Sequence, residues 1–255
     1  MAAAKKAQRR GRHAKVDFPE YGSRTDVGLV RDHNEDSLTV APPVFAVADG
    51  MGGHAAGEVA SEIAIQTLVE NAPDTADGDA LARAVVEANR AVIRAAVDGR
   101  GKQGMGTTMT AAVLDGARLV VAQVGDSRAY LLRDGRLSRI TCDHSYVQHL
   151  IDTGRISEAE ARNHPQRNVV MRVLGDFDID SRPDIAIRKA HPGDRWLLCS
   201  DGLSNMVEDT ELCRLISQKK DISEIGAELI LKANKNGGLD NIAVVLVEID
   251  NSEVG

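Results

Sequence analysis

The 255-residue sequence has few aromatic side chains, with one Trp, three Tyr and three Phe. A buried core therefore has to be built mainly from Ala, Val, Leu and Ile, and the 43% hydrophobic content allows such a core. No break in composition divides the chain. We expect a single domain over residues 16–250 that follows a short tail, residues 1–15.

Cysteine is also scarce, and the three thiols, Cys142, Cys199 and Cys213, are widely spaced. An odd number at such spacing argues against a disulfide framework and favours reduced thiols in a cytoplasmic protein. None is followed by a phosphate-cradling loop, so a catalytic thiol is not expected. The paired Cys and His spacing typical of zinc sites is missing. Cys199 lies in an apolar run and is interpreted as inert packing.

No long apolar run follows the tail, which argues against a secretory signal or a membrane span. The tail holds six Lys and Arg and no acid, which leaves 25 basic and 38 acidic residues in the remainder, a balance of −13. A body this acidic is poorly suited to nucleic acid. We expect the tail to be solvated and flexible; contact with an acidic partner or membrane surface is the alternative.

Strands follow one another without intervening helices in the middle of the chain. They are expected at 107–114, 118–124, 128–133 and 137–140, with Asp115-Gly116 and Asp134-Gly135 as hairpin turns. Successive hairpins predict antiparallel sheet and exclude a doubly wound nucleotide-binding fold. The phosphate-binding loop G-x-x-x-x-G-K-[ST] is absent as well.

Helical periodicity predicts a hairpin of two helices at 53–71 and 79–98, the first with Val59, Ile63, Leu68 and Val69 as its apolar stripe. Further helices are expected near 210–217 and 222–234, and further strands at 185–188, 195–200 and 242–249. Two packed sheets with helices outside them would accommodate this set of elements, an α+β fold.

Residues 143–175 interrupt the strand pattern. The segment is polar and has a capping-box helix start at Ser157-Glu158-Ala159-Glu160. We interpret it as a strand-free surface flap that acts as a lid or specificity element.

Acidic residues recur where apolar strands end. Asp49 follows the run from Val44, Asp126 follows 119–124, Asp201 follows 195–200, and Asp240 precedes 242–249. One Asp-Gly alone is equally well a plain turn. Four acids converging on one place would repel each other unless cations offset their charge. Carboxylate, carbonyl and water ligands suit Mg²⁺ or Mn²⁺, so the pattern indicates a site for hard divalent cations.

Arg31 lies four residues before the acidic pair Glu35-Asp36. Arg grips phosphate through two parallel hydrogen bonds, so this cluster is a candidate phosphate site. A solvated group of surface ion pairs is the alternative.

Seven short motifs occur in one order between about residues 22 and 249. They are Gly28 to Arg31 with Asn34-Glu35-Asp36, Val47 to His54, Gly106-Thr107-Thr108, Val124 to Arg128, Asp143-His144-Ser145, Leu198 to Leu203, and Asp240-Asn241-Ile242. In these motifs the chain closely resembles the metal-dependent Ser/Thr protein phosphatases of type 2C, in their short bacterial form. The resemblance implies a four-layer α-β-β-α sandwich of two mainly antiparallel sheets with two metal ions, Mn²⁺ or Mg²⁺, in a cleft at one edge.

The resemblance also implies a role for each site residue. Asp49 would bridge both cations, Asp201 and Asp240 would complete the first site, and the Gly50 carbonyl would serve the second. Glu35 and Asp36 would hold the second ion's waters, and Asp126 with Asp201 would bind a third ion. Arg31 would clamp the substrate phosphate.

The implied reaction is hydrolysis of phosphoserine or phosphothreonine by direct attack of a water that bridges the metals. The implied partners are phosphorylated proteins, including a bacterial Ser/Thr kinase that the enzyme opposes, and the expected form is a monomer. Where animal members have a His after Asp-Gly, this chain has Met51, so the general acid is either His54 or a metal-bound water. Arg172 and His144 are candidates for substrate contact, with packing or solvated-surface roles as the alternatives.

Other functions stay open from sequence alone. One is an inactive or regulatory scaffold of the same fold, although every ligand position is filled. Another is a phosphatase for a small phosphate ester or a partner-switch protein. A more remote one is nucleic-acid binding through the tail.

Overall fold

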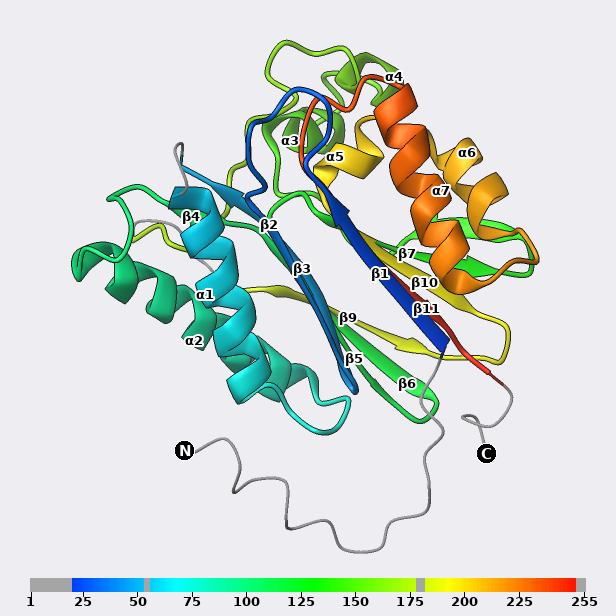
Figure 1. Cartoon of the computed structure of the whole chain (residues 1–255), viewed down its shortest axis with the longest axis horizontal. Coiled ribbons are helices and arrows are strands. Elements are labelled where there is room, and N and C mark those ends of the chain that lie inside the picture. The colour runs from blue at the N-terminus through cyan, green and yellow to red at the C-terminus, as the bar shows by residue number, and fades with distance from the viewer. Residues whose placement is uncertain (1–19, 53–55, 178–181, 251–255) are drawn as a thin grey trace, which may run out of the picture.

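The computed structural model describes residues 20–52, 56–177 and 182–250. The expected tail, residues 1–15, and His54 lie outside these ranges. In the described residues the chain forms two sheets that face one another, with helices on both outer sides (Figure 1).

The first sheet has the strand order β1-β11-β10-β7-β8. Its strands are β1 (Glu20–Asp26), β7 (Arg128–Arg133), β8 (Arg136–Arg139), β10 (Arg195–Cys199) and β11 (Ile242–Glu248). The second sheet has the order β2-β3-β5-β6-β9, with β4 paired to β3. Its strands are β2 (Asp36–Ala41), β3 (Val44–Met51), β4 (Gly106–Thr107), β5 (Met109–Asp115), β6 (Arg118–Val124) and β9 (Asp184–Lys189).

Every strand pairing recorded in the described residues is antiparallel, which confirms the prediction from the hairpin signals. The turn at Asp134-Gly135 takes positive φ at both residues, 50° and 72°, as a tight two-residue hairpin requires. Together with its layers, this arrangement is the α+β sandwich expected from the sequence.

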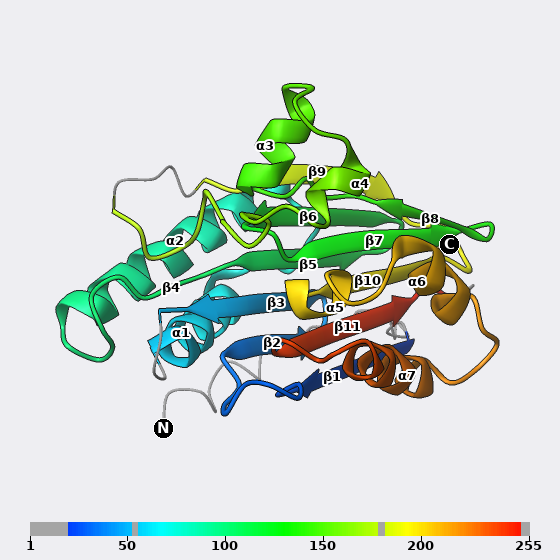
Figure 2. The same ribbon diagram turned by 90° about the horizontal axis from the view of Figure 1, so that it is seen from above.

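The helices cover the outer faces of the two sheets, as Figure 2 shows from above. Helices α1 (Ala56–Asn71) and α2 (Gly78–Val97) pack on each other and on the second sheet. Helices α5 (Asp201–Ser204), α6 (Asp209–Ile216) and α7 (Ile222–Lys235) lie on the first sheet. No helix among the described residues has the length and hydropathy needed to cross a membrane.

The interior between the sheets is apolar. Alternate residues of the strands point inward, such as Phe45 and Val47 on β3 and Trp196 and Leu198 on β10, and all four are at most 2% exposed. Because the opposite faces of these strands are covered by helices, both faces are buried and the strands are apolar nearly throughout.

Two sequence expectations are wrong in detail. Strand β3 does not end at Asp49-Gly50 but continues to Met51, because Gly50 and Met51 pair with β4. In the expected stripe of α1, Leu68 is buried and Val59 and Ile63 pack against the core, but Val69 is 41% exposed, and small residues such as Ala60 and Ala64 complete the buried face. Small side chains are needed there because the helix lies close to the strand backbone.

The predicted flap, residues 143–175, contains two short helices, α3 (Tyr146–Asp152) and α4 (Glu158–Ala161), and no strand. Both halves of the expected capping box are formed at Ser157 and Glu160. The base of the flap is closed by backbone hydrogen bonds from Tyr146 to Val169 and from Met171 to His144. In Figure 2 the flap helices α3 and α4 lie at the top of the view.

Candidate metal centre

Two acids face each other across the edge strand of the second sheet and its neighbour. Asp36 on β2 and Asp49 on β3 are directly opposite in the antiparallel register. Like charges in this position destabilise a sheet. Burial, Asp201 and Asp240 together raise the pKa of Asp36 to about 8, although a hydrogen bond from Ser200 opposes the shift. The fold therefore holds two carboxyl groups whose simultaneous ionisation is opposed by burial and mutual repulsion.

Asp201 and Asp240 reach the same place from the first sheet. Asp201 is the first residue of α5, and its carboxyl group contacts that of Asp49. Burial and the charge of Asp240 raise the pKa of Asp201 to about 6. Burial and then the charges of Asp36 and Asp201 raise the pKa of Asp49 well above its ordinary value. Acids from both sheets thus meet at one edge of the sandwich.

Arg31 adds a positive charge at the rim of this cluster. Its guanidinium Nη2 donates to Asp240 Oδ2 at 2.7 Å, and 48% of its side chain is exposed. The pairing of an exposed guanidinium with a site acid places a phosphate-binding group beside the carboxylates. Arg31 and the acidic pair after it are therefore brought to the cluster, where Arg31 forms a partly exposed ion pair with Asp240.

The backbone of Gly50 lies between α1 and the loop before β2. A Cβ atom at Gly50 would meet the Gly57 carbonyl oxygen at 2.2 Å and the Glu35 carbonyl oxygen at 2.5 Å. The Gly50 amide donates to that Glu35 carbonyl at 3.1 Å. Only glycine fits here, which explains why α1 presents small residues to β3. Gly50 and Glu35 are thereby placed together.

The Glu35 carboxyl group has an unused oxygen. Its residue is 8% exposed, no hydrogen bond from the described residues reaches Oε1, and His33 Nε2 lies 3.5 Å from this atom. A buried carboxylate oxygen without a hydrogen bond is costly, so a water or cation is the expected partner.

Asp126 lies on the turn after β6, and its residue is 8% exposed. Burial raises the pKa of this group well above its ordinary value, and the nearby charges of Asp201 and Asp143 add to the shift. The preceding Gly125 has a φ of 101°, and its amide donates to His144 Nδ1 at 3.1 Å. His144 thus holds the turn that carries Asp126. This contact agrees with a packing role for His144, the alternative to substrate contact.

Several residues that hold these acids were quoted in motifs but given no role from the sequence. Thr108 Oγ1 accepts from the Asp49 amide, and Thr107 Oγ1 donates to the Asp49 carbonyl, both at 2.9 Å. Ser200 Oγ donates to Asp36 Oδ2 at 2.7 Å. In the sequence, each of these residues is visible only as a Ser or Thr inside a motif. The acid that its hydroxyl group contacts lies elsewhere in the chain, so the contact can be seen only in the fold.

Asn241 is the clearest of these positioning residues. Its Oδ1 accepts from the Glu35 amide at 2.8 Å, and its Nδ2 donates to the carbonyls of Val27 and His33 at 2.9 Å each. One side chain therefore fastens the loop that carries Arg31 to the start of β11.

The donor set fits hard divalent cations. It consists of carboxylates and a backbone carbonyl, the oxygen ligands that Mg²⁺ and Mn²⁺ prefer. As placed, no three His, Cys, Asp or Glu side chains among the described residues form a complete ligand group for one ion. One reason is that Asp240 is engaged with Arg31. The remaining ligands at such sites are usually waters.

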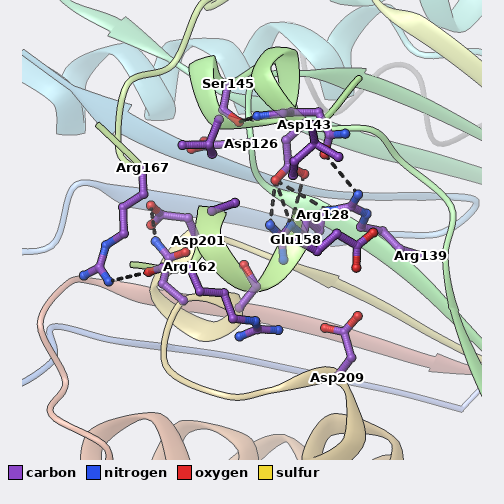
Figure 3. Close-up of a pocket in the computed structure, with 16 residues that line it drawn as sticks. Asp126, Arg128, Arg139, Asp143, Ser145, Glu158, Arg162, Arg167, Asp201 and Asp209 are labelled. Atoms are coloured by element: carbon purple, nitrogen blue, oxygen red, sulfur yellow. Dashed lines mark hydrogen bonds and ion pairs between the residues drawn. The ribbon is translucent and has the colours of Figure 1, made fainter. Parts of the chain in front are cut away.

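A cavity of about 230 Å³ joins this centre to the flap. Its lining includes Asp126 and Asp201 together with residues of the flap, among them Glu158, Arg162 and Arg167, as Figure 3 shows. The flap therefore borders the space beside the acids, where a lid or specificity element would have to lie.

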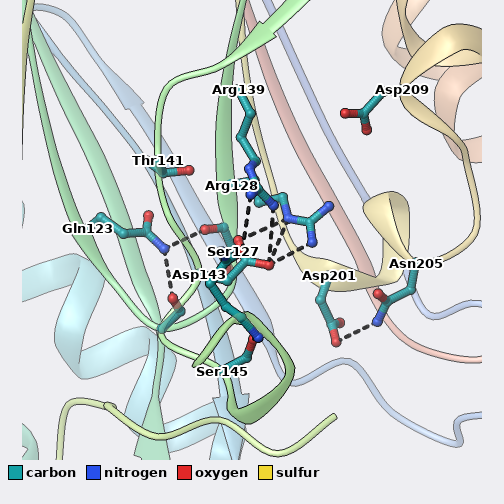
Figure 4. A network of polar contacts seen from close by, with 12 residues as sticks. Gln123, Ser127, Arg128, Arg139, Thr141, Asp143, Ser145, Asp201, Asn205 and Asp209 are labelled. Atoms are coloured by element: carbon teal, nitrogen blue, oxygen red, sulfur yellow. Dashed lines mark hydrogen bonds and ion pairs between the residues drawn. The ribbon is translucent and has the colours of Figure 1, made fainter. Parts of the chain in front are cut away.

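A buried ion pair supports the base of the flap (Figure 4). Arg128 Nη2 lies 2.6 Å from Asp143 Oδ2, and Arg128 Nε donates to both carboxylate oxygens, at 3.0 and 3.1 Å. The two side chains are 18% and 6% exposed. The pair joins β7 to the first residue of the flap.

Other candidates are placed as follows. Arg172 Nη1 lies 3.0 Å from both His144 Nε2 and Asp184 Oδ1, which fits its packing interpretation. Cys199 is buried, and burial raises the pKa of its thiol to about 12, so it is not a nucleophile at neutral pH.

Comparison with known proteins gives the family. The family described as "Protein phosphatase 2C" matches residues 30–244. This chain belongs to the protein phosphatase 2C family. It is 45% identical to the serine/threonine protein phosphatase PstP of Mycobacterium tuberculosis over 238 residues, which are 92% of this chain and 46% of that protein. The chain thus spans about half the length of this relative.

Another 2C relative matches over nearly its full length. The serine/threonine phosphatase stp of Listeria monocytogenes is 41% identical over 244 residues, covering 91% of this chain and 96% of that protein. Among solved structures, the catalytic domain of PstP in complex with two manganese ions has a TM-score of 0.84 at 40% identity, covering 92% of this chain and 99% of that one. The family and fold inferred from the motifs are confirmed.

Proposed function

We propose that this chain is a metal-dependent protein serine/threonine phosphatase, a phosphoric monoester hydrolase that uses Mn²⁺ or Mg²⁺. The observation that carries the proposal is the convergence of Asp36, Asp49, Asp201 and Asp240 beside the exposed guanidinium of Arg31. The two manganese ions in the PstP catalytic domain support the same choice of metal.

The proposed ligand set follows the position of each group. Asp49, which lies between the other acids, serves both cations, and Asp201 and Asp240 complete the first site. The Gly50 carbonyl serves the second, where Glu35 and Asp36 hold waters. Asp126 with Asp201 forms a third site.

Each side chain has a distinct task in the proposed reaction. Bound divalent cations would supply a water of lowered pKa and stabilise the attacking and leaving oxygens. Arg31 binds and orients the phosphate. To do so, its guanidinium group has to leave Asp240 and bind the substrate phosphate instead. The low exposure of Asp36 and Glu35 limits bulk water around the second site. No protein nucleophile is required.

The proposal extends to the organisation of the chain and its partners. The phosphatase domain is residues 16–250, preceded by the basic tail 1–15, and the flap 143–175 contributes specificity. The substrates are phosphorylated proteins, including a Ser/Thr kinase. The phosphatase acts on them as a monomer in the cytoplasm. An inactive scaffold is disfavoured because each acid of the proposed ligand set is present.

Phosphate release from phosphothreonine and phosphoserine peptides tests the function. We expect turnover with Mn²⁺ or Mg²⁺ and none in excess chelator, because without cations the acids repel the phosphate. Adding back each metal separately should restore activity. Undiminished turnover in excess chelator would falsify the proposed mechanism.

Amide hydrogen exchange tests the flap. Between residues 151 and 173 the only buried residue is Ala161, so little apolar burial opposes local opening. We expect protection there to be about a hundredfold lower than in β5 or β11. The base of the flap is an internal control that should exchange more slowly, because the His144 amide donates to the Gly125 carbonyl and the Tyr146 amide to the Val169 carbonyl. Exchange as slow as in the central strands would contradict a lid.

A further inference from the structure

Three large apolar side chains lie exposed at the rim of the metal centre. Leu29 is 68% exposed, Val30 is 61% exposed and Leu239 is 47% exposed. Single exposed apolar residues are common on protein surfaces and need no explanation. These three, however, lie on two loops that touch each other, and we call them the rim ledge.

Backbone contacts hold the two loops of the rim ledge together. The Leu29 amide donates to the Gly238 carbonyl at 2.7 Å. The Leu29 side chain lies against the glycine turn, since a Cβ atom at Gly238 would meet Leu29 Cγ at 2.9 Å. Leu239 borders the same turn, with its Cγ at 3.6 Å from a Cβ placed at Gly237. Glycines thus leave room for apolar side chains on this surface.

The rim ledge is continuous with the groups proposed to bind phosphate. Val30 directly precedes Arg31, Leu239 directly precedes Asp240, and these two charged residues are paired at 2.7 Å. The flap cavity reaches Asp126 and Asp201 from the other side. In Figure 2 the rim loops and the flap lie on opposite sides of α5. The acids therefore lie between the apolar rim ledge and the more polar flap.

Polar contacts also hold the rim loop. Asn241 fastens the backbone at Val27 and His33, and Asn34 Nδ2 donates to Thr25 Oγ1 at 2.7 Å. The contacts of Leu29 and Leu239 with the glycine turn use only part of these side chains, and most of the apolar surface of the rim ledge remains exposed.

We propose that the rim ledge binds an apolar side chain of the phosphoprotein substrate, one or two residues from the phosphorylated residue. The proposal rests on the phosphatase function above. An extended chain advances about 3.3 Å per residue, so with the phosphate at Arg31 the neighbouring substrate residues lie within several ångströms of the ledge. Burial of an apolar side chain against Leu29, Val30 and Leu239 removes apolar surface from water on both partners.

The test compares phosphothreonine peptides that differ only in having Leu or Ser at one flanking position, taken in turn from two before to two after the phosphothreonine. We expect at least one position at which the Leu peptide has a kcat/KM about tenfold higher, equivalent to about 1.4 kcal/mol. In the double variant Leu29→Ser, Leu239→Ser this ratio is expected to fall to about twofold or less. The ratio is insensitive to a uniform change in activity.

Leu231→Ser is the matched control, because Leu231 is 53% exposed on α7, outside the rim loops. It should keep the wild-type ratio, and unfolding temperatures should show that all variants fold. A ratio near one at every position in the wild type would overturn the proposal that the rim ledge binds an apolar substrate side chain. A preference for Leu that persists in the double variant would overturn it as well. Failure of the wild type to release phosphate from any peptide would instead overturn the phosphatase function.

Discussion

Asp49→Asn is expected to lower phosphopeptide turnover by at least about a thousandfold at saturating Mn²⁺, because it removes the ligand proposed to serve both cations. Loss of metal stabilisation of the reacting oxygens costs several kcal/mol, and each 1.36 kcal/mol is a factor of ten in rate. Binding of Mn²⁺ followed by calorimetry should weaken in parallel. Turnover within tenfold of the wild type would show that Asp49 does not hold the catalytic ions.

Stability separates this loss from unfolding. In metal-free protein the Asn substitution removes one of several like charges in a buried cluster, so the unfolding temperature should stay the same or rise by a few degrees. In the wild type, added Mn²⁺ should raise that temperature through binding to the folded state, and this increase should shrink in the variant. Asp115→Asn, at the exposed last residue of β5, is the matched control and should change neither activity nor stability.

Asp143→Ala is expected to lower the free energy of unfolding by about 3 to 5 kcal/mol, the usual cost of leaving a buried charge without its partner. Arg128 makes three contacts of 2.6 to 3.1 Å with this carboxylate, and both side chains lie in a mostly buried site. Urea unfolding of both proteins at one metal concentration measures the difference.

Two further variants test whether charge is the cause. Replacing both Arg128 and Asp143 by Leu should recover part of the lost stability, because Arg128 is then no longer a buried charge without its partner. Glu87→Ala breaks the exposed pair with Arg90, whose side chains are 40% and 60% exposed, and should cost less than about 1 kcal/mol. A loss equally small for Asp143→Ala would mean that water or another group solvates Arg128.

Most of the fold was predictable because its signals are local. The strands over 118–124 and 128–133 match β6 and β7, since short apolar runs and Asp-Gly turns indicate them without long-range information. The end of β3 was not predictable, because its last residues pair with β4, more than fifty residues away. The inward face of α1 was misjudged for a related reason, since the close approach of Gly57 to Gly50 favours small residues over large ones.

The site was predictable to the level of its acids. Their recurrence beside strands, together with family motifs, indicated Asp49, Asp126, Asp201 and Asp240, and the fold brings them together. The geometry between them could not be read from the chain. That Asp36 lies opposite Asp49 depends on the register of β2 against β3, and local sequence does not specify that register.

The amide of Asn241 has a wider consequence for how this protein tolerates change. Its three hydrogen bonds join the segment of Arg31 to the residue next to Asp240, so the proposed phosphate-binding group and one proposed cation ligand are held by the same side chain. A shift in either loop is transmitted to the other. Drift in that spacing would alter the approach of the phosphorus atom to the ions while every reactive side chain remained in place, so activity could be lost with an intact set of catalytic residues.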